Sequence, residues 1–148
     1  MVHYSIQRDH VHLLVEAHDN QTLANGMKSL GARFARSVNR VFDRSGPVLK
    51  ERFHSVVKAT PLEVRRALAY VLLNVRKHYR KTKKVNPPVA IDEASSGRWF
   101  RGWRQGYSPP PPEDIEEVGR AETWLLRAGW RRHGLIDLAE VPNYEAAI

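Results

Sequence analysis

The chain has 148 residues, enough for one domain with a modest core and a small appendage. Lys and Arg number 24 against 16 Asp and Glu, a formal net charge of +8, so we expect a polyanionic partner, with nucleic acid first. The absence of cysteine excludes disulfides and thiolate metal sites. No signal-like or long apolar stretch appears, so we expect a cytoplasmic protein without a membrane partner.

Two short strand patterns open the chain, over residues 2–7 and 10–17, and so short a break between them predicts a β-hairpin. Every second side chain of a strand points the same way, so His10 and His12 share a face, about 6.6 Å apart along the strand. Two imidazoles placed in this way can converge on one divalent ion. The alternative is a hydrogen-bonded or edge-exposed pair, and a third ligand is needed to decide between the two.

A long amphipathic helix is predicted next. Residues 18–22 offer several N-caps, and apolar residues then recur every three or four positions, at Leu23, Met27, Leu30, Phe34, Val38 and Val41. Four cations lie off this stripe with no acid among them: Lys28, Arg33, Arg36 and Arg40. We interpret them as a phosphate-facing surface, with an ordinary solvated face as the alternative.

The next elements expected are a strand over residues 52–58 and the best-marked helix of the chain. Thr60 can cap that helix, Pro61 suits its first position, and Glu63 completes a capping box. We expect the helix to run to about Tyr79.

This helix has an apolar face made of Val64, Leu68, Val71, Leu72 and Val75. A second group lies nearly opposite at 100° per residue, namely Glu63, Arg66, Tyr70, Asn74 and Lys77. Tyr70 and Asn74 are adjacent on that surface, one turn apart. A half-exposed tyrosine is the plain interpretation. However, it stands beside an amide that can ligate a metal and beside two cations that can hold phosphate.

The character of the chain changes after residue 84. We predict a core over 1–84, a linker containing Pro, Gly and Trp over 85–112, and a helical extension over 113–148. The linker ends in four prolines, residues 109–112, which form a stiff spacer. All four tryptophans fall after residue 98. We favour their packing the extension onto the domain, and the alternative is stacking on bases.

Several segments, in this order, resemble the single-tyrosine HUH transposases, most closely the REP-associated tyrosine transposases. They are Asp9 to Glu16 with the His-x-His pair, the basic helix with Met27, Gly46-Pro47-Val48 with Arg52-Phe53-His54, and Ala69 to Asn74 with Tyr-x-x-x-Asn. The resemblance covers roughly residues 2–80, and residues 123–134 resemble an extension of one proteobacterial branch.

The resemblance implies an α+β fold, a ferredoxin-like antiparallel sheet with helices on one face, plus a small helical C-terminal extension. It implies that Tyr70 is the nucleophile and that His10, His12 and Asn74 hold Mg²⁺ or Mn²⁺. In the family, tyrosine attacks a phosphate of single-stranded or hairpin DNA, which gives a 5′-phosphotyrosine and a free 3′-hydroxyl that can later rejoin strands. The cations expected to contact the DNA are Lys28, Arg33, Arg36, Arg40, Arg66 and Lys77.

Family members carry a strand and a helix ahead of the hairpin, at which this chain starts. We therefore expect either a start codon further upstream or a shortened copy. Two functions stay open: a single-strand DNA endonuclease and strand-transferase, and a DNA-binding remnant that has lost catalysis. A conventional metal hydrolase ranks third, because no carboxylate cluster accompanies the histidines. The chain acts either alone or as a homodimer, and Tyr70 serves its own site or a partner's.

Overall fold

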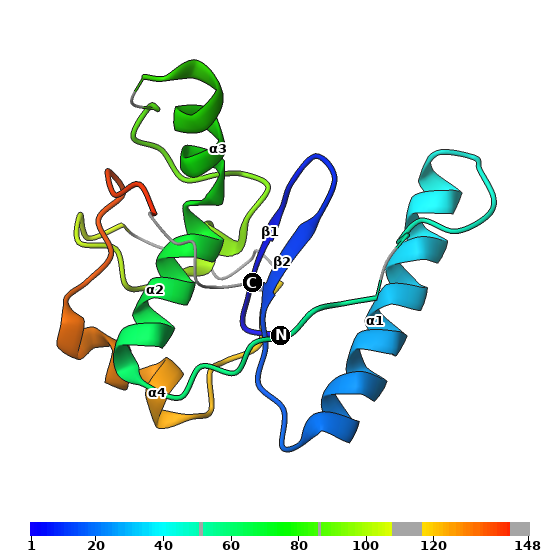
Figure 1. The fold of residues 1–148 in the computed structure, drawn as a ribbon, viewed down its shortest axis with the longest axis horizontal. Helices are drawn as coiled ribbons and strands as arrows, with labels where there is room; N and C mark the ends of the chain where they lie inside the picture. The colour runs from blue at the N-terminus through cyan, green and yellow to red at the C-terminus, as the bar shows by residue number, and fades with distance from the viewer. Residues whose placement is uncertain (51, 86, 108–116, 143–148) are drawn as a thin grey trace. The chain divides into compact units, whose positions relative to one another are not determined.

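The computed structural model describes residues 1–50, 52–85, 87–107 and 117–142 in two compact units, shown in Figure 1. Unit 1 holds residues 1–16 and the described residues from 57 onward, and unit 2 holds residues 17–56. The elements in chain order are β1 (His3–Ile6), β2 (Val11–Leu14), α1 (Asn20–Val41), α2 (Pro61–Leu72), α3 (Asn74–Lys83), η1 (Ser96–Trp99), α4 (Trp124–Arg127) and η2 (Gly129–His133). This content confirms the predicted α+β class.

Strands β1 and β2 form the predicted antiparallel hairpin, in which Ser5 pairs with His12 and His3 pairs with Leu14. Residues that pair across two strands point to the same side of the sheet, so these four side chains share one face. Helix α2 contacts both strands, and His3 and Ser5 are buried. On the opposite face, Ile6 stays exposed.

The prediction of a strand over residues 52–58 is wrong. Within the described ranges, β1 and β2 are the only strands, and residues 52–58 form neither helix nor strand. A strand needs a neighbouring backbone for its hydrogen bonds, and no described segment pairs with this one.

The outer edge of β1 is met by a segment from much later in the chain. The N–H of Ile6 donates to the carbonyl of Ala94 at 2.8 Å, and the N–H of Tyr4 donates to Ser96 Oγ at 2.9 Å. Ser5 also forms an isolated antiparallel bridge with Ser95. Residues 94–96 therefore satisfy backbone groups that an open sheet edge would leave unpaired.

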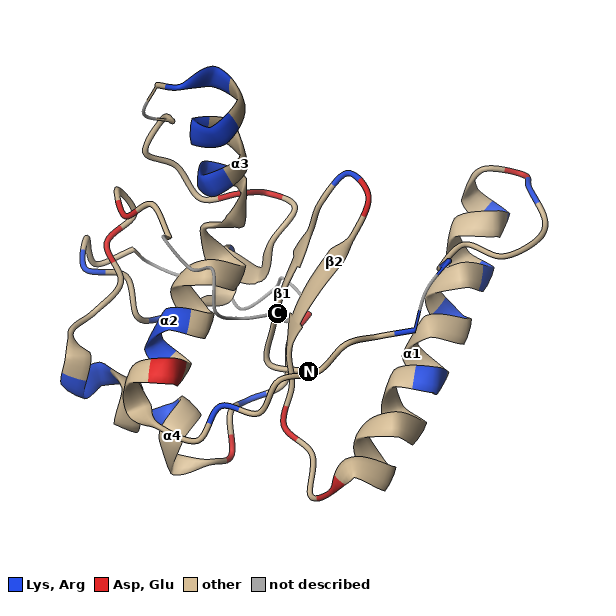
Figure 2. Cartoon of the chain, viewed as in Figure 1, with Lys and Arg blue, Asp and Glu red and all other residues tan. Residues whose placement is uncertain are grey.

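Unit 2 is built on α1, whose N-cap is Asp19, one of the predicted candidates. Its Oδ1 accepts from the N–H of Thr22 at 2.6 Å. Lys and Arg residues occur along α1, and none of its residues is buried (Figure 2). The chain turns after the helix at Gly46, whose φ of +96° lies in the left-handed region that favours glycine.

The helix expected from residue 60 to about Tyr79 is present as two helices. Its start is as predicted: Glu63 Oε2 accepts from the N–H of Thr60 at 2.9 Å in a capping box. Helix α2 then ends at Leu72, and Leu73, with φ −114° and ψ 20°, separates it from α3. The break shifts the phase of the helix. Val75, expected in the core, is 37% exposed, whereas Arg76 is 3% exposed.

The core of unit 1 lies between α2 and the C-terminal part of the chain. Phe100, Trp103, Trp130 and Ile136 pack against buried residues of α2, among them Leu68. This confirms the packing interpretation for Trp103 and Trp130. The two indoles also satisfy their N–H groups, by donating to the carbonyls of Gly97 at 2.9 Å and Leu126 at 3.1 Å.

The described part of the extension has less helix than expected, since it holds only the short α4 and η2. Residues on both sides of the predicted boundaries at 84 and 112 share one core. The three-part domain division stays a prediction. The prolines at 109–112 lie outside the described residues.

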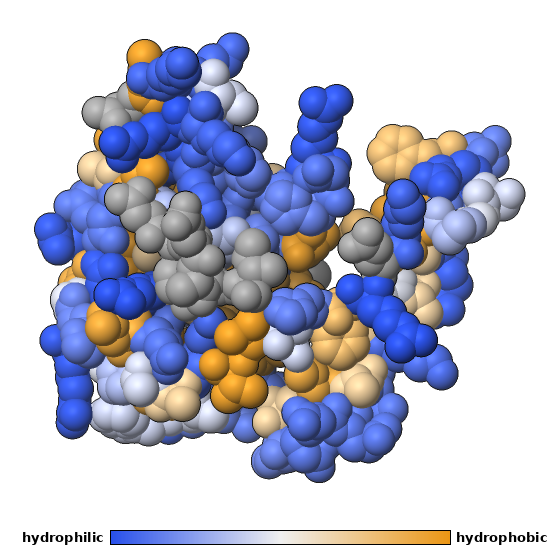
Figure 3. Space-filling model, viewed as in Figure 1, coloured by the Kyte–Doolittle hydropathy of each residue, from blue (hydrophilic) through white to orange (hydrophobic). Residues whose placement is uncertain are grey.

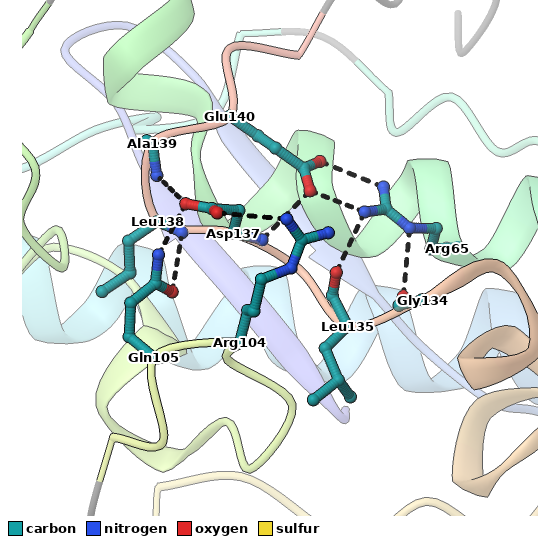
Figure 4. Close-up of polar contacts among 9 residues, drawn as sticks. All are labelled: Arg65, Arg104, Gln105, Gly134, Leu135, Asp137, Leu138, Ala139 and Glu140. Atoms are coloured by element: carbon teal, nitrogen blue, oxygen red, sulfur yellow. Dashed lines mark hydrogen bonds and ion pairs between the residues drawn. The ribbon is translucent and has the colours of Figure 1, made fainter.

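Two arginines tie the helices of unit 1 to the extension. Arg65 pairs with Glu140 at 2.6 Å and 3.0 Å and donates to the carbonyls of Gly134 and Leu135, as drawn in Figure 4. Buried Arg76 donates to backbone carbonyls of two segments, at Pro87, Pro88, Ala139 and Glu140. These contacts hold residues 134–140 against α2 and α3.

No helix in the described ranges combines the length and the apolar character needed to cross a bilayer. Figure 3 shows hydrophobic residues scattered among predominantly hydrophilic ones on one face.

Replacing Arg65 by alanine tests the tie to the extension, with its neighbour as a matched control. Arg65→Ala should lower the free energy of unfolding by about 2 kcal/mol, because it leaves a partly buried carboxylate and two carbonyls without their donor. Arg66→Ala removes the same charge from an exposed side chain and should change the free energy of unfolding by less than about 0.5 kcal/mol. Urea unfolding of the full chain measures both variants. Equal losses of unfolding free energy would contradict the role of Arg65 in holding residues 134–140 in place.

Stability should fall in mild acid because of His3. Burial lowers the pKa of His3 to about 4, so the unfolded chain binds its proton first as the pH drops. The stability from the neutral ring is complete above pH 6.5 and is lost as the pH falls to about 4. When the pH is lowered from 7.5 to 4.5, the free energy of unfolding of His3→Gln should fall by about 2–3 kcal/mol less than that of the wild type. Urea titrations at the two pH values measure this difference. His18→Gln, at an exposed position, should behave as the wild type.

Candidate active site

The two hairpin histidines converge, as the strand alternation predicted. His10 Nε2 and His12 Nε2 lie 3.0 Å apart, and the two ring centroids are 4.6 Å apart. Both residues lie in unit 1, on the hairpin face that packs against α2.

Asp9 fixes the orientation of the first of these rings. Its Oδ1 lies 2.6 Å from His10 Nδ1, and this hydrogen bond is the main cause that lowers the pKa of Asp9. A carboxylate accepts, so Nδ1 carries the proton. In the neutral ring, Nε2 then presents its lone pair toward His12. A carboxylate behind a histidine is a common support for a metal-binding nitrogen.

Tyr70 lies directly against the second histidine. The ring centroids of His12 and Tyr70 are 4.9 Å apart at an interplanar angle of 74°. Lys77 Nζ lies 4.8 Å from the centroid of the Tyr70 ring, a cation–π distance. Tyr70 is only 9% exposed, so the interpretation of a half-exposed tyrosine is wrong. It is buried because α2 is covered on more than one side, by the hairpin as well as by the extension.

The environment keeps His12 uncharged. Burial first, and then positive charge on His10, His78 and Lys77, together lower the pKa of His12 to about 4. Near neutral pH the ring is therefore a neutral imidazole, which is the form that ligates a metal.

His78 is a member of this group that the sequence interpretation missed. Its ring centroid is 5.7 Å from that of His10, and its pKa is lowered first by burial and then by the charges of His10 and Lys77. Its place four residues after Asn74, one helical turn, was the available signal.

Asn74 is buried, and no contact between it and the histidines is seen among the described residues. It is 0% exposed, and its Oδ1 and Nδ2 have no hydrogen-bond partner among the described residues. No group of three or more His, Cys, Asp and Glu side chains in the described part of the chain forms a metal site. The predicted donor set of two histidines and one amide stays a prediction.

The cations expected to contact DNA are divided between the two units. Arg66 is exposed on α2, and Lys77 lies beside Tyr70 in unit 1. The other four are exposed on α1 in unit 2: Lys28, Arg33, Arg36 and Arg40. Their role in binding stays a prediction.

Comparison with known families bears on this site directly. Residues 1–59 match a family model described as "Transposase IS200 like". The matched residues are about two fifths of the chain, and in this part the chain is similar to the IS200-like transposases. The match confirms the resemblance seen in the sequence and indicates a transposase-like protein.

The transposase match contains both hairpin histidines and all of α1, and it ends before α2 and Tyr70. Comparisons with curated proteins and with solved structures gave no match. The contact between His12 and Tyr70 therefore comes from the structure of this chain and not from a relative.

The orphaned amide of Asn74 gives a test of this site in the absence of metal. Asn74→Leu keeps the side-chain volume and removes two buried polar atoms that lack partners, so metal-free stability should stay equal or rise by about 1–2 kcal/mol. Thermal or urea unfolding in a chelator measures it. A loss of more than about 1 kcal/mol would mean that the amide is already satisfied by the protein.

Proposed function

We propose that this chain cleaves and rejoins single-stranded DNA through a covalent link to Tyr70. The observation that carries the proposal is the contact of the Tyr70 ring with His12, at 4.9 Å, beside a second histidine whose Nε2 is 3.0 Å from that of His12. A phenol next to two converging imidazoles and a lysine is a group suited to phosphoryl transfer.

The donors present fit a divalent ion. Two imidazole nitrogens converge, and a buried amide has no partner among the described residues. His10, His12 and Asn74 would hold the ion, and this mixture of nitrogen and oxygen donors suits Mn²⁺ better than Mg²⁺. When bound, such an ion polarises the scissile phosphate and offsets its negative charge.

The chain's own residues supply the nucleophile and its position. Tyr70 Oη forms a bond to phosphorus as the bond from phosphorus to the 3′ oxygen breaks, and the phenolic proton ends on that oxygen. The products are a 5′-phosphotyrosine and a free 3′-hydroxyl, and the reverse step rejoins the strand. No nucleotide cofactor is needed, because the phosphodiester energy is kept in the new ester.

Lys77 and the packing around Tyr70 assist this step. The ammonium group beside the ring stabilises negative charge on the phenol oxygen and attracts a phosphate. The ring is held against His12 within a buried region, which limits the orientations it has to lose on reaching the reacting geometry.

Removing one oxygen from Tyr70 tests this function. In Mn²⁺, the wild type should form a covalent adduct with labelled single-stranded hairpin DNA, seen as a shifted band on a denaturing gel. Tyr70→Phe should abolish the adduct and leave DNA binding in place. His12→Ala should reduce adduct formation by at least about tenfold, because the ion loses a ligand.

Tyr79→Phe is the matched control, since it makes the same change on α3 at a residue that is 37% exposed. It should form the adduct as the wild type does. Adduct formation by Tyr70→Phe at the wild-type level would show that another residue is the nucleophile. DNA binding without an adduct in the wild type would favour the catalytically inactive remnant.

A further inference from the structure

His78 lies at the candidate site but has no role in the cleavage proposed above. Its ring centroid is 5.7 Å from that of His10, and the two ring planes are inclined at 55°. The backbone carbonyl of His78 accepts from Thr82 Oγ1 at 2.9 Å, whereas no hydrogen bond of its ring is seen among the described residues. The ring nitrogens of His78 are therefore available to a ligand.

Helix α3 sets two successive side chains against two different members of the site. Lys77 Nζ lies over the Tyr70 ring at 4.8 Å, and His78 lies beside His10. Asn74 precedes His78 by one helical turn, so these two side chains lie on one side of α3. The amide already proposed as a ligand and a third imidazole thus come from the same side of one helix.

The separations of the rings are close to those of imidazoles that share one ion. Two imidazole nitrogens bound at about 2.1 Å and at a right angle lie about 3.0 Å apart, with ring centroids about 4.6 Å apart. At a tetrahedral angle the centroids are about 5.3 Å apart. His10 and His12 show 3.0 Å between their Nε2 atoms and 4.6 Å between their centroids. The 5.7 Å between His10 and His78 exceeds the tetrahedral value by only about 0.4 Å.

The pair of hairpin histidines does not by itself distinguish an ion from a hydrogen bond between the rings, because both give this separation of the nitrogens. A third imidazole nearly at ligand distance favours the ion. As they stand, the His, Asp and Glu side chains in the described ranges make up no three-ligand group. The His78 side chain is exposed, so its ring can turn toward the other two without disturbing the core.

We propose that His78 is a further ligand of the divalent ion that His10, His12 and Asn74 would hold. This inference rests on the proposed function for the presence of the ion. It adds a residue that the family match does not reach, since that match ends at residue 59. Three imidazoles favour a first-row transition ion over Mg²⁺, which prefers oxygen ligands. His78 thereby helps to set which metal the site takes.

The test observes the histidine rings directly. Long-range ¹H–¹⁵N correlation spectra of the full chain, labelled with ¹⁵N-histidine, report on the ring nitrogens of its seven histidines. Zn²⁺ is the probe, because it is diamagnetic and imidazole nitrogen binds it. With one equivalent of Zn²⁺, the signals of His10, His12 and His78 should shift together. The remaining rings should keep their chemical shifts: His3, His18, His54 and His133.

The outcomes separate this inference from the proposed function. Shifts at His10 and His12 without one at His78 would overturn the inference and leave the proposed metal site standing. In that case His78 only packs beside His10 or contacts DNA. No shift at any of the three rings would contradict the ion itself, and with it both proposals.

The affinity for Mn²⁺ gives a second measurement, by titration calorimetry without DNA. His78→Ala should weaken Mn²⁺ binding at least about tenfold, because the ion loses a ligand. His133→Ala is the matched control, since it removes an exposed histidine from η2 in the same unit. It should change the affinity for Mn²⁺ by less than about twofold, because it removes neither a ligand nor a neighbour of one. Equal Mn²⁺ affinities of folded His78→Ala and the wild type would overturn the inference.

Discussion

The organisation of unit 1 depends on covering α2 on more than one side. Seven of its twelve residues are buried, from Val64 to Leu72, which is more than a single apolar stripe can account for. The β-hairpin contacts the helix, and aromatic residues from the chain after α3 pack against it as well. Burial of this area is the main favourable contribution to the stability of the unit. It also fixes the rotation of α2, and with it the direction of Tyr70.

The chain after α3 is therefore part of the framework of the candidate site. Phe100, Trp103 and Trp130 supply core that the hairpin and α2 lack on their own. Arg65 and Arg76 then hold the returning chain in place by hydrogen bonds, and residues 94–96 occupy the outer edge of β1. The family match ends at residue 59, so it includes the hairpin that contacts Tyr70 but not the later segments that pack against α2.

Local signals in the sequence were sufficient for much of the fold. Alternation predicted the hairpin and the common face of His10 and His12, and the Thr60–Glu63 capping box marked the start of α2. The burial of Trp103 and Trp130 followed from the usual preference of large aromatic side chains.

Features that depend on distant contacts were missed. The strand expected over residues 52–58 has suitable residues but no described partner to pair with. The break at Leu73 carries no Gly or Pro, so the hydrophobic periodicity predicted one continuous helix. That prediction placed Val75 in the core, whereas Arg76 is the buried residue. His78 was missed for the same reason, since its approach to His10 requires the packing of α3 near the hairpin.

His10, His12 and Tyr70 are proposed to form one metal-dependent site. Paramagnetic broadening by Mn²⁺ tests it most directly, in protein labelled with ¹³C at its five tyrosine rings and with the Tyr70 signal assigned from Tyr70→Phe. Substoichiometric Mn²⁺ should broaden the Tyr70 signal before the other four, and His12→Ala should remove this selectivity. A Tyr70 signal that stays sharp while Mn²⁺ binds, or selective broadening that persists in His12→Ala, would contradict it.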